Sequence, residues 1–129
     1  MPNTKCRVIV VDDDGDTALT FALLLVGMGH EATFLTNPAE VEEAVARIRP
    51  HIVFLDIGMP GLSGWDLARV LRRQYPHDTL RLVAITGRSE PQAYARSRQA
   101  GFDAHVTKPV AVDLVESILQ QLVFPGRQP

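Results

Sequence analysis

The sequence predicts an α/β fold in which helices cover both faces of a parallel sheet. Short runs rich in Val, Ile, Leu and Phe alternate five times with segments of helix length, an order typical of repeated βα units. The first, third and fourth runs show no alternation of apolar and polar residues, as expected of strands buried on both faces. Apolar residues make up 46% of the 129 residues, enough for a core on each side of one sheet.

The runs define the strands, and the intervals between them define the helices. Strands are predicted at Arg7–Val11, Glu31–Leu35, Ile52–Leu55, Leu80–Ile85 and Ala104–Val106, and helices at Thr17–Met28, Pro38–Ile48, Gly64–Tyr75, Glu90–Ala100 and Val110–Val123. The arrangement would be a flavodoxin-like, doubly wound (βα)5 fold with strand order 2-1-3-4-5, in which the second strand is an edge strand.

Residues at the helix ends support these boundaries. Asn37 precedes Pro38 and is expected to cap the second helix, with Glu40 placed to reach back as a capping box. Gly29 and Gly101 each follow a helical run, where a left-handed residue often ends a helix.

The last helix carries more apolar residues than one core face requires. Core spacing selects Ala111, Leu114, Val115, Ile118 and Leu122, which leaves Val112, Leu119 and Val123 as a second apolar stripe.

Composition excludes several classes of function. The net charge of −2 and the pI of about 6.0 argue against direct binding to nucleic acid. The longest apolar stretch, Phe21–Met28, is too short for membrane insertion. The lone Cys6 and the lack of a signal-peptide pattern indicate a cytoplasmic protein. One domain is expected over residues 1–124, with 125–129 as a C-terminal tail or linker stub.

Four of the five predicted strands end in a chemically capable side chain. These are Asp12 and Asp13 after the first strand, Asp56 after the third, Thr86 after the fourth and Lys108 just beyond the fifth. Because ligands of open parallel sheets bind at the carboxyl ends of the strands, we expect these five residues to meet at one edge.

Each of these residue types suits phosphoryl transfer to a carboxylate. Clustered carboxylates repel one another unless a cation such as Mg²⁺ lies between them. Asp12 and Asp13 are therefore expected to bind metal, whereas Asp14 and Asp16 fit a solvated turn that caps a helix. Beside a cation, Asp56 is ionised and can attack a phosphoryl group without a general base.

Lys108 and Thr86 supply the complementary groups. The chain has eleven Arg but only two Lys, so a lysine at a strand end suggests a compact ammonium aimed at phosphate. The Thr86 hydroxyl could donate to a phosphoryl oxygen. Metal, lysine and hydroxyl around an aspartate would form a complete set for this chemistry.

At these residues the sequence resembles the receiver domain of two-component response regulators. The resemblance covers residues 5 to 123 through four motifs, which are Val8–Asp14, Leu55–Gly64, Ile85–Gly87 and Gly101–Pro109. It implies that Asp56 is the phosphoacceptor, that Asp13 and Asp56 bind Mg²⁺ directly and Asp12 mainly through water, and that the Gly58 carbonyl also contacts the metal. It further implies that Thr86 and Lys108 hold the phosphoryl oxygens and that the Lys108–Pro109 peptide is cis.

The resemblance also implies partners and points of variation. The phosphoryl donor would be a phosphohistidine on a histidine kinase or phosphotransfer domain, and a homodimer or partner would use the fourth and fifth helices. Gly58 and Arg88 stand at the positions expected to tune the lifetime of the phosphorylated form. His105 replaces the Tyr or Phe common at the switch position. The chain would be either a stand-alone regulator or part of a hybrid sensor kinase.

Two other functions remain open at this point. A phosphatase of the haloacid dehalogenase type would also use Asp, Thr, Lys and Mg²⁺, and Asp12–Gly15 superficially resembles its first motif. That family needs two metal-binding acids after the lysine, where only Asp113 and Glu116 follow, and it gives Asp56 no role. A receiver-like scaffold that works without phosphorylation is the second alternative, and the complete set of site residues argues against it.

Overall fold

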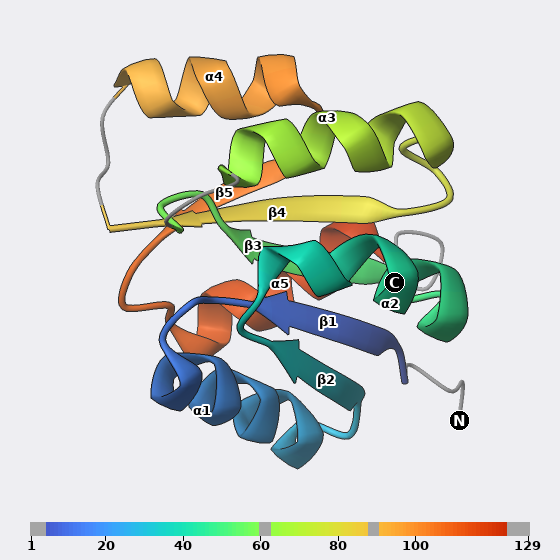
Figure 1. The fold of residues 1–129 in the computed structure, drawn as a ribbon. Helices are drawn as coiled ribbons and strands as arrows, with labels where there is room; N and C mark the ends of the chain where they lie inside the picture. The colour runs from blue at the N-terminus through green and yellow to red at the C-terminus, as the bar shows by residue number, and fades with distance from the viewer. Residues whose placement is uncertain (1–4, 60–62, 88–90, 124–129) are drawn as a thin grey trace.

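The computed structural model describes residues 5–59, 63–87 and 91–123. Five parallel strands form one sheet in the order β2-β1-β3-β4-β5 (Figure 1), which confirms the predicted fold class and strand order. The strands are β1 (Arg7–Val11), β2 (Glu31–Leu35), β3 (Ile52–Asp56), β4 (Arg81–Thr86) and β5 (Ala104–Thr107). The helices are α1 (Gly15–Gly27), the short 3₁₀ helix η1 (Pro38–Glu40), α2 (Val41–Ile48), α3 (Gly64–Gln74), α4 (Pro91–Ala100) and α5 (Val112–Leu122).

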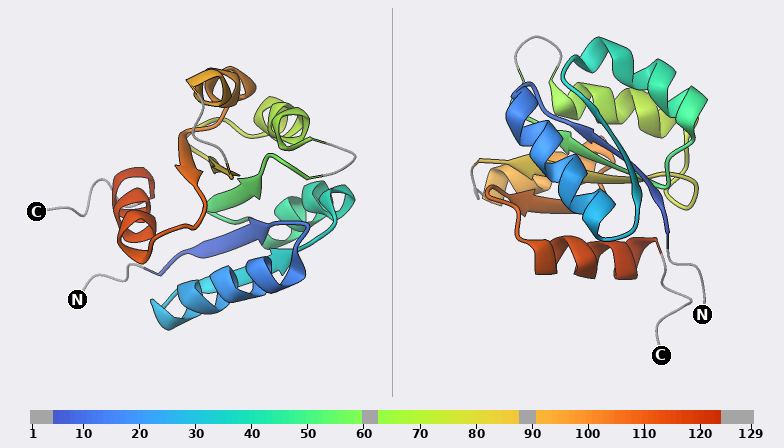
Figure 2. Two further views of the ribbon diagram at one scale, coloured as in Figure 1. Left: turned by 90° about the vertical axis from the view of Figure 1, so that its left-hand side faces the viewer. Right: turned by 90° about the horizontal axis from the view of Figure 1, so that it is seen from below.

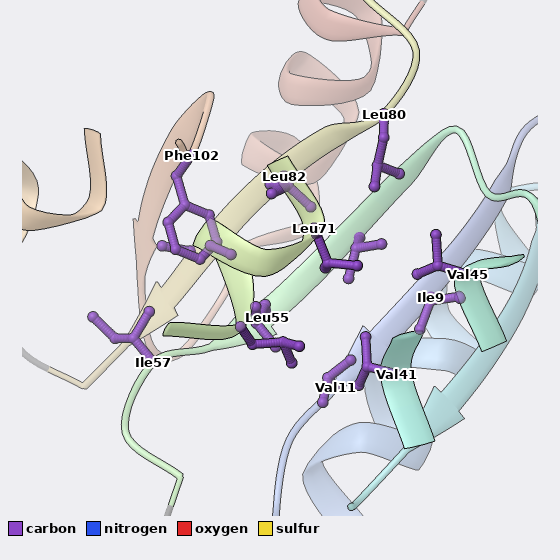
Figure 3. Close-up of a cluster of buried hydrophobic side chains, with 14 of the residues drawn as sticks. Ile9, Val11, Val41, Val45, Leu55, Ile57, Leu71, Leu80, Leu82 and Phe102 are labelled. Carbon is purple, nitrogen blue, oxygen red and sulfur yellow. The ribbon is translucent and has the colours of Figure 1, made fainter. Parts of the chain in front are cut away.

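Two separate cores hold the helices on the sheet. Helices α1 and α5 cover one face, and α2, α3 and α4 lie on the other (Figure 2). Figure 3 shows the second of these cores, where side chains of β1, β3 and β4 meet those of α2 and α3. Because side chains alternate along a strand, Val8 and Val10 pack under α1 while Ile9 and Val11 pack under α2.

The register of the sheet aligns the strand ends that carry the reactive residues. Val11 pairs with Leu55, so that Asp12 and Asp56 follow at the same level. Asp56 pairs with Ile85, and Thr86 pairs with Thr107 immediately before Lys108. Strands β3 and β4 therefore run to Asp56 and Thr86 themselves, one residue further than predicted.

The N-terminus of α2 differs from the prediction. The Asn37 side chain accepts a hydrogen bond from the Ala39 N–H at 3.0 Å, but it caps the short η1 rather than an α-helix. Helix α2 begins only at Val41, and Glu40 makes no side-chain capping bond. The proline after Asn37 fits a first helical position, and the first turn is wound as 3₁₀, a form common at helix ends. Gly29 and Gly101 adopt φ angles of 97° and 108°, as predicted.

The buried face of α5 is rotated from the predicted one. Leu119 is 2% exposed and lies in the core with Val115 and Ile118, whereas Leu114 is 42% exposed. The prediction assigned these two leucines the opposite way. Residues 115, 118 and 119 follow the i, i+3, i+4 spacing of one helix face, and Leu114 lies about 100° away from Val115 around the axis.

Candidate functional site

Asp12, Asp56 and Lys108 form one contact cluster at the carboxyl edge of the sheet. The Lys108 ammonium lies 2.9 Å from Asp12 Oδ2 and 3.2 Å from Asp56 Oδ2. The two carboxylates come from the neighbouring strands β1 and β3, and the lysine reaches them from the end of β5. Asp12 is 1% exposed and Asp56 is 5% exposed. A buried pair of carboxylates therefore shares one cation.

A third carboxylate completes a group that can hold a metal ion. Asp12, Asp13 and Asp56 each offer a carboxylate oxygen within 4.8 Å of the others. Asp13 is exposed, in contrast to its two partners. Three oxygen ligands on a solvent-open edge suit Mg²⁺, which binds through few carboxylates and keeps several waters. The donor set therefore fits the magnesium ion that the sequence implies.

The electrostatics of Asp56 are set by opposing effects. Burial raises the pKa of the Asp56 carboxyl above its ordinary value, although the Gly58 N–H bond and the Lys108 ammonium act in the other direction. For Lys108, burial by itself lowers the pKa, but bonds and charges from Asp12 and Asp56 outweigh it and the pKa is raised. Lys108 is therefore held in its protonated, charged form. The ionised form of Asp56 is destabilised by burial, and a divalent cation beside it would offset that cost.

The loop after β3 orients the Asp56 side chain. The Gly58 N–H donates to Asp56 Oδ1 at 2.8 Å, which leaves Oδ2 toward Lys108. Gly64, the first residue of α3, packs against the backbone of the same strand end. A Cβ at this position would lie 2.6 Å from Ile57 Cα and 2.7 Å from the Asp56 carbonyl oxygen. Only glycine lets α3 begin this close to Asp56.

Thr86 and Lys108 are joined through the backbone. The Lys108 N–H donates to the Thr86 carbonyl at 2.7 Å, continuing the ladder between β4 and β5. Thr86 is 7% exposed and lies at the same sheet edge as Asp56. The peptide between Lys108 and Pro109 is cis, as the resemblance implied.

Asp14 takes part in helix capping, as expected from the sequence. Its side chain accepts from the Asp16 N–H at 3.1 Å and from the Thr17 hydroxyl at 2.9 Å. The Thr17 bond lowers the pKa of Asp14. Asp14 therefore caps α1, and the acids that gather with Asp56 are Asp12 and Asp13.

A largely apolar cleft opens beside the acidic group. It has a volume of about 910 Å³ and lies between α1 and the segment after β5. Phe21, Leu24 and Val110 line it together with Asp12 and Lys108. Leu23, which also lines the cleft, is 60% exposed.

The remaining predicted residues lie elsewhere. His105 is on β5 and contacts α4, where its Nδ1 is 3.1 Å from Ser97 Oγ and its ring stacks on Tyr94. Arg88 and the tail at 125–129 lie outside the described residues. Gly64 and Ser97 were not predicted as site residues from the sequence. The glycine-rich turn was a signal for the first, but no local pattern marks the second.

Comparisons with known proteins agree with this geometry. The family model for the response regulator receiver domain matches residues 8–120. The DNA-binding response regulator MtrA of Mycolicibacterium smegmatis is 30% identical over 109 residues, which cover 84% of this chain and 46% of that protein. The chain thus spans about half the length of this curated relative.

Solved structures share the fold closely. A CheY-like response regulator receiver domain protein from Methanospirillum hungatei matches with a TM-score of 0.81 and 26% identity, over 90% of this chain and 92% of that one. Chemotaxis protein CheY4 of Vibrio cholerae matches with a TM-score of 0.85 and 18% identity, over 92% of this chain and 99% of that one. Among the described residues, no helix is long and apolar enough to cross a membrane.

Proposed function

The chain belongs to the response regulator receiver domain family, and we propose that its Asp56 accepts a phosphoryl group from a phosphohistidine donor in a Mg²⁺-dependent reaction. The observation that carries this proposal is the contact of Lys108 with both buried carboxylates, at 2.9 Å from Asp12 and 3.2 Å from Asp56. A lone acid at a strand end could serve a turn. Two buried acids that share one ammonium keep a net negative charge, which favours a divalent cation; that cation and Lys108 can then meet a phosphoryl group.

Each site residue has a distinct role in the proposed phosphoryl transfer. A carboxylate oxygen of Asp56 attacks phosphorus, the P–N bond of the donor breaks, and its electron pair stays on the imidazole nitrogen. Thr86 and Lys108 hold the phosphoryl oxygens. Asp13, Asp56 and the Gly58 carbonyl would hold Mg²⁺, and Asp12 would act mainly through water. The bound ion supplies charge neutralisation for the carboxylates and the incoming phosphoryl group.

The same site governs how long the modification lasts. Hydrolysis requires water to approach the phosphoryl group in line. Gly58 has no side chain to block or orient this water, and a Cβ there would lie 3.4 Å from Asp56 Oδ1. We assign Gly58 and Arg88 as the positions that tune the lifetime.

We assign a donor surface and an output surface next to the site. The cleft beside α1 gives a phosphohistidine domain an apolar surface next to Lys108. The face of α4, β5 and α5 offers Tyr94, Val112 and Leu114, which are 43%, 41% and 42% exposed. Phosphorylation adds charge that Thr86 and Lys108 must meet, and this biases the output face toward a partner or a second copy. His105 lies on this face as the switch residue.

The phosphatase alternative has less support. Asp113 and Glu116 lie on α5, both exposed, and neither joins the metal-capable group found among the described residues. Asp56, in contrast, belongs to the metal-capable group and contacts Lys108.

Stoichiometry separates the two functions. A receiver incubated with phosphoramidate, a small donor with a P–N bond, and Mg²⁺ gains at most one phosphoryl group per chain. It leaves p-nitrophenyl phosphate unhydrolysed over the same period. Continuous turnover of p-nitrophenyl phosphate that is lost in Asp12→Asn but kept in Asp56→Asn would favour the phosphatase instead.

A further inference from the structure

The buried hydroxyl of Ser97 connects two rings from different parts of the sequence. Ser97 lies on α4 and is 1% exposed. Its Oγ accepts a hydrogen bond from the Trp65 indole N–H at 3.1 Å and lies 3.1 Å from Nδ1 of His105. One side chain thus links the start of α3, the middle of α4 and strand β5.

The donors and acceptors in this bridge indicate which nitrogen of the His105 imidazole carries the proton. An indole N–H can only donate, so Ser97 Oγ is the acceptor in that bond. The oxygen could accept a second bond as well, but among the described residues the hydroxyl proton has no acceptor other than His105 Nδ1, which therefore accepts it as a bare ring nitrogen. An imidazole that accepts at Nδ1 is neutral and carries its proton on Nε2.

The Nε2 atom has no favourable place for a second charge. It is buried without a hydrogen-bond partner in the described part of the chain, and the ring stacks on Tyr94 with centroids 4.2 Å apart. A buried cation with an unsatisfied N–H is costly. Burial accordingly lowers the pKa of His105.

The charged groups around the ring do not offset this cost. Arg98 and Asp103 line the hollow next to His105, together with the neutral Tyr94. The Asp103 carboxylate is engaged by Arg72 at 3.0 Å and by the Leu82 N–H at 2.8 Å; its other oxygen lies 2.6 Å from His77 and 3.7 Å from Arg81.

The other neighbouring elements add no carboxylate among the described residues. Strand β4 places Ala84 opposite His105. Helix α3 contributes Trp65, over which the Arg96 guanidinium lies at 3.8 Å.

We propose that Ser97 is a positioning residue that holds neutral His105 against α4, and that protonation of His105 reverses its bond to Ser97 and so perturbs the Trp65 bond to the same oxygen. Trp65 directly follows Gly64, which packs on the Asp56 backbone. Proton uptake on β5 would therefore reach the helix that supports the acidic site. This inference goes beyond phosphoryl transfer and does not depend on it.

The wild-type chain provides the first test. In imidazole ¹⁵N NMR at pH 7.5, we expect the Nδ1 of His105 to be unprotonated. Between pH 8 and 5, Trp65, the only tryptophan, should change its emission with the same midpoint as the His105 ring, below the free value of about 6.5. A protonated Nδ1 at pH 7.5 would overturn the proposal, and so would a Trp65 emission that stays constant while His105 titrates. Both results come from the wild type and do not depend on how the variants fold.

Three variants then separate coupling from general structural change. His105→Phe should abolish the emission transition. Ser97→Ala should shift the His105 midpoint, because the ring loses its partner at Nδ1, and should uncouple Trp65 from it. His51→Asn is the matched control, since the asparagine oxygen can still accept from the Arg7 N–H as His51 does at 2.9 Å. It should leave the transition in place. An unchanged transition in His105→Phe or Ser97→Ala would contradict the proposal.

Discussion

Burial makes the position of Asp56 unfavourable for a charged carboxylate. Asp56 is 5% exposed, and burial raises its pKa despite the Gly58 and Lys108 contacts. A raised native pKa means that the folded state holds its proton more tightly than the unfolded state. Ionised Asp56 therefore costs stability as the pH rises above the ordinary carboxyl range.

Asp56→Asn should consequently stabilise the metal-free protein. We expect a gain of about 1 kcal/mol, or a Tm increase of about 3–5 °C for a domain of this size. Mg²⁺ should raise the Tm of the wild type but raise that of the variant much less, because one of three ligands is lost. Thermal unfolding in EDTA and in Mg²⁺ measures both effects. A variant less stable than the wild type in EDTA would show that Asp56 is not strained.

Gly64 is predicted to support Asp56 through close packing alone. Gly64→Ala places a Cβ 2.6 Å from Ile57 Cα, and this overlap must move either α3 or the strand end. We expect a loss of about 1–3 kcal/mol in unfolding free energy and slower phosphorylation by acetyl phosphate. Gly27→Ala is the matched control, because that helical position has open space around it. It should be neutral or stabilising, by up to about 1 kcal/mol. Equal losses in the two variants would refute the packing argument.

Residues differ in how far the sequence discloses their roles. Asp12, Asp56, Thr86 and Lys108 were predictable because each ends or follows a strand, and parallel strands bring such ends together. The role of Gly64 depends on the distance between two backbones, which no spacing rule encodes. Ser97 was not predictable either, since its two partners are 32 and 8 residues away and a buried serine resembles any other helical serine.

At the scale of elements, the sequence predicted the strands better than the helix faces. β1 and β2 have the predicted bounds, and β3, β4 and β5 each extend one residue further at the end facing the site. A strand buried on both faces leaves a simple signal in its continuous apolar run. Helix α5 is apolar at Val112, Leu114, Val115, Ile118 and Leu119, so periodicity allows more than one buried face, and packing against the sheet selects among them.

The observed orientation of α5 makes a quantitative prediction. Leu119→Ala removes a side chain that is 2% exposed, whereas Leu114→Ala removes one that is 42% exposed. We expect losses of about 2–4 kcal/mol for the first and below about 1 kcal/mol for the second. Urea unfolding of both variants compares them directly. A larger loss in Leu114→Ala would restore the face that the sequence pattern suggested.

At the scale of the whole molecule, the histidines determine how stability responds to mild acid. Burial is the main cause that lowers the pKa of His30, His51 and His105 in the folded chain. The unfolded chain therefore binds more protons than the folded chain once the pH falls below about 6.5. Stability conferred by the neutral rings is complete above that pH and declines as the pH falls toward the native pKa values.

Chemical denaturation between pH 7.5 and 5 should show this decline. The loss should be smaller in a variant that combines His51→Asn with His105→Phe, because two of the three protonation sites are gone. Asp56 opposes the trend, since its raised pKa favours the folded state as the pH falls. The Asp56→Asn background should therefore show a steeper decline than the wild type. A stability that rises steadily from pH 7.5 to 5 in the Asp56→Asn background would contradict the assignment of the histidines.

Phosphorylation of Asp56 is the step on which the proposed function depends most directly. Intact mass after incubation with acetyl phosphate and Mg²⁺ measures this, with EDTA as the metal-free reference and Asp16→Asn as a control that removes a nearby exposed acid. Phosphorylation at Asp56 predicts one adduct of roughly 80 Da in the wild type and in Asp16→Asn, little in EDTA, and none in Asp56→Asn. An adduct that forms on Asp56→Asn at the wild-type rate would contradict it.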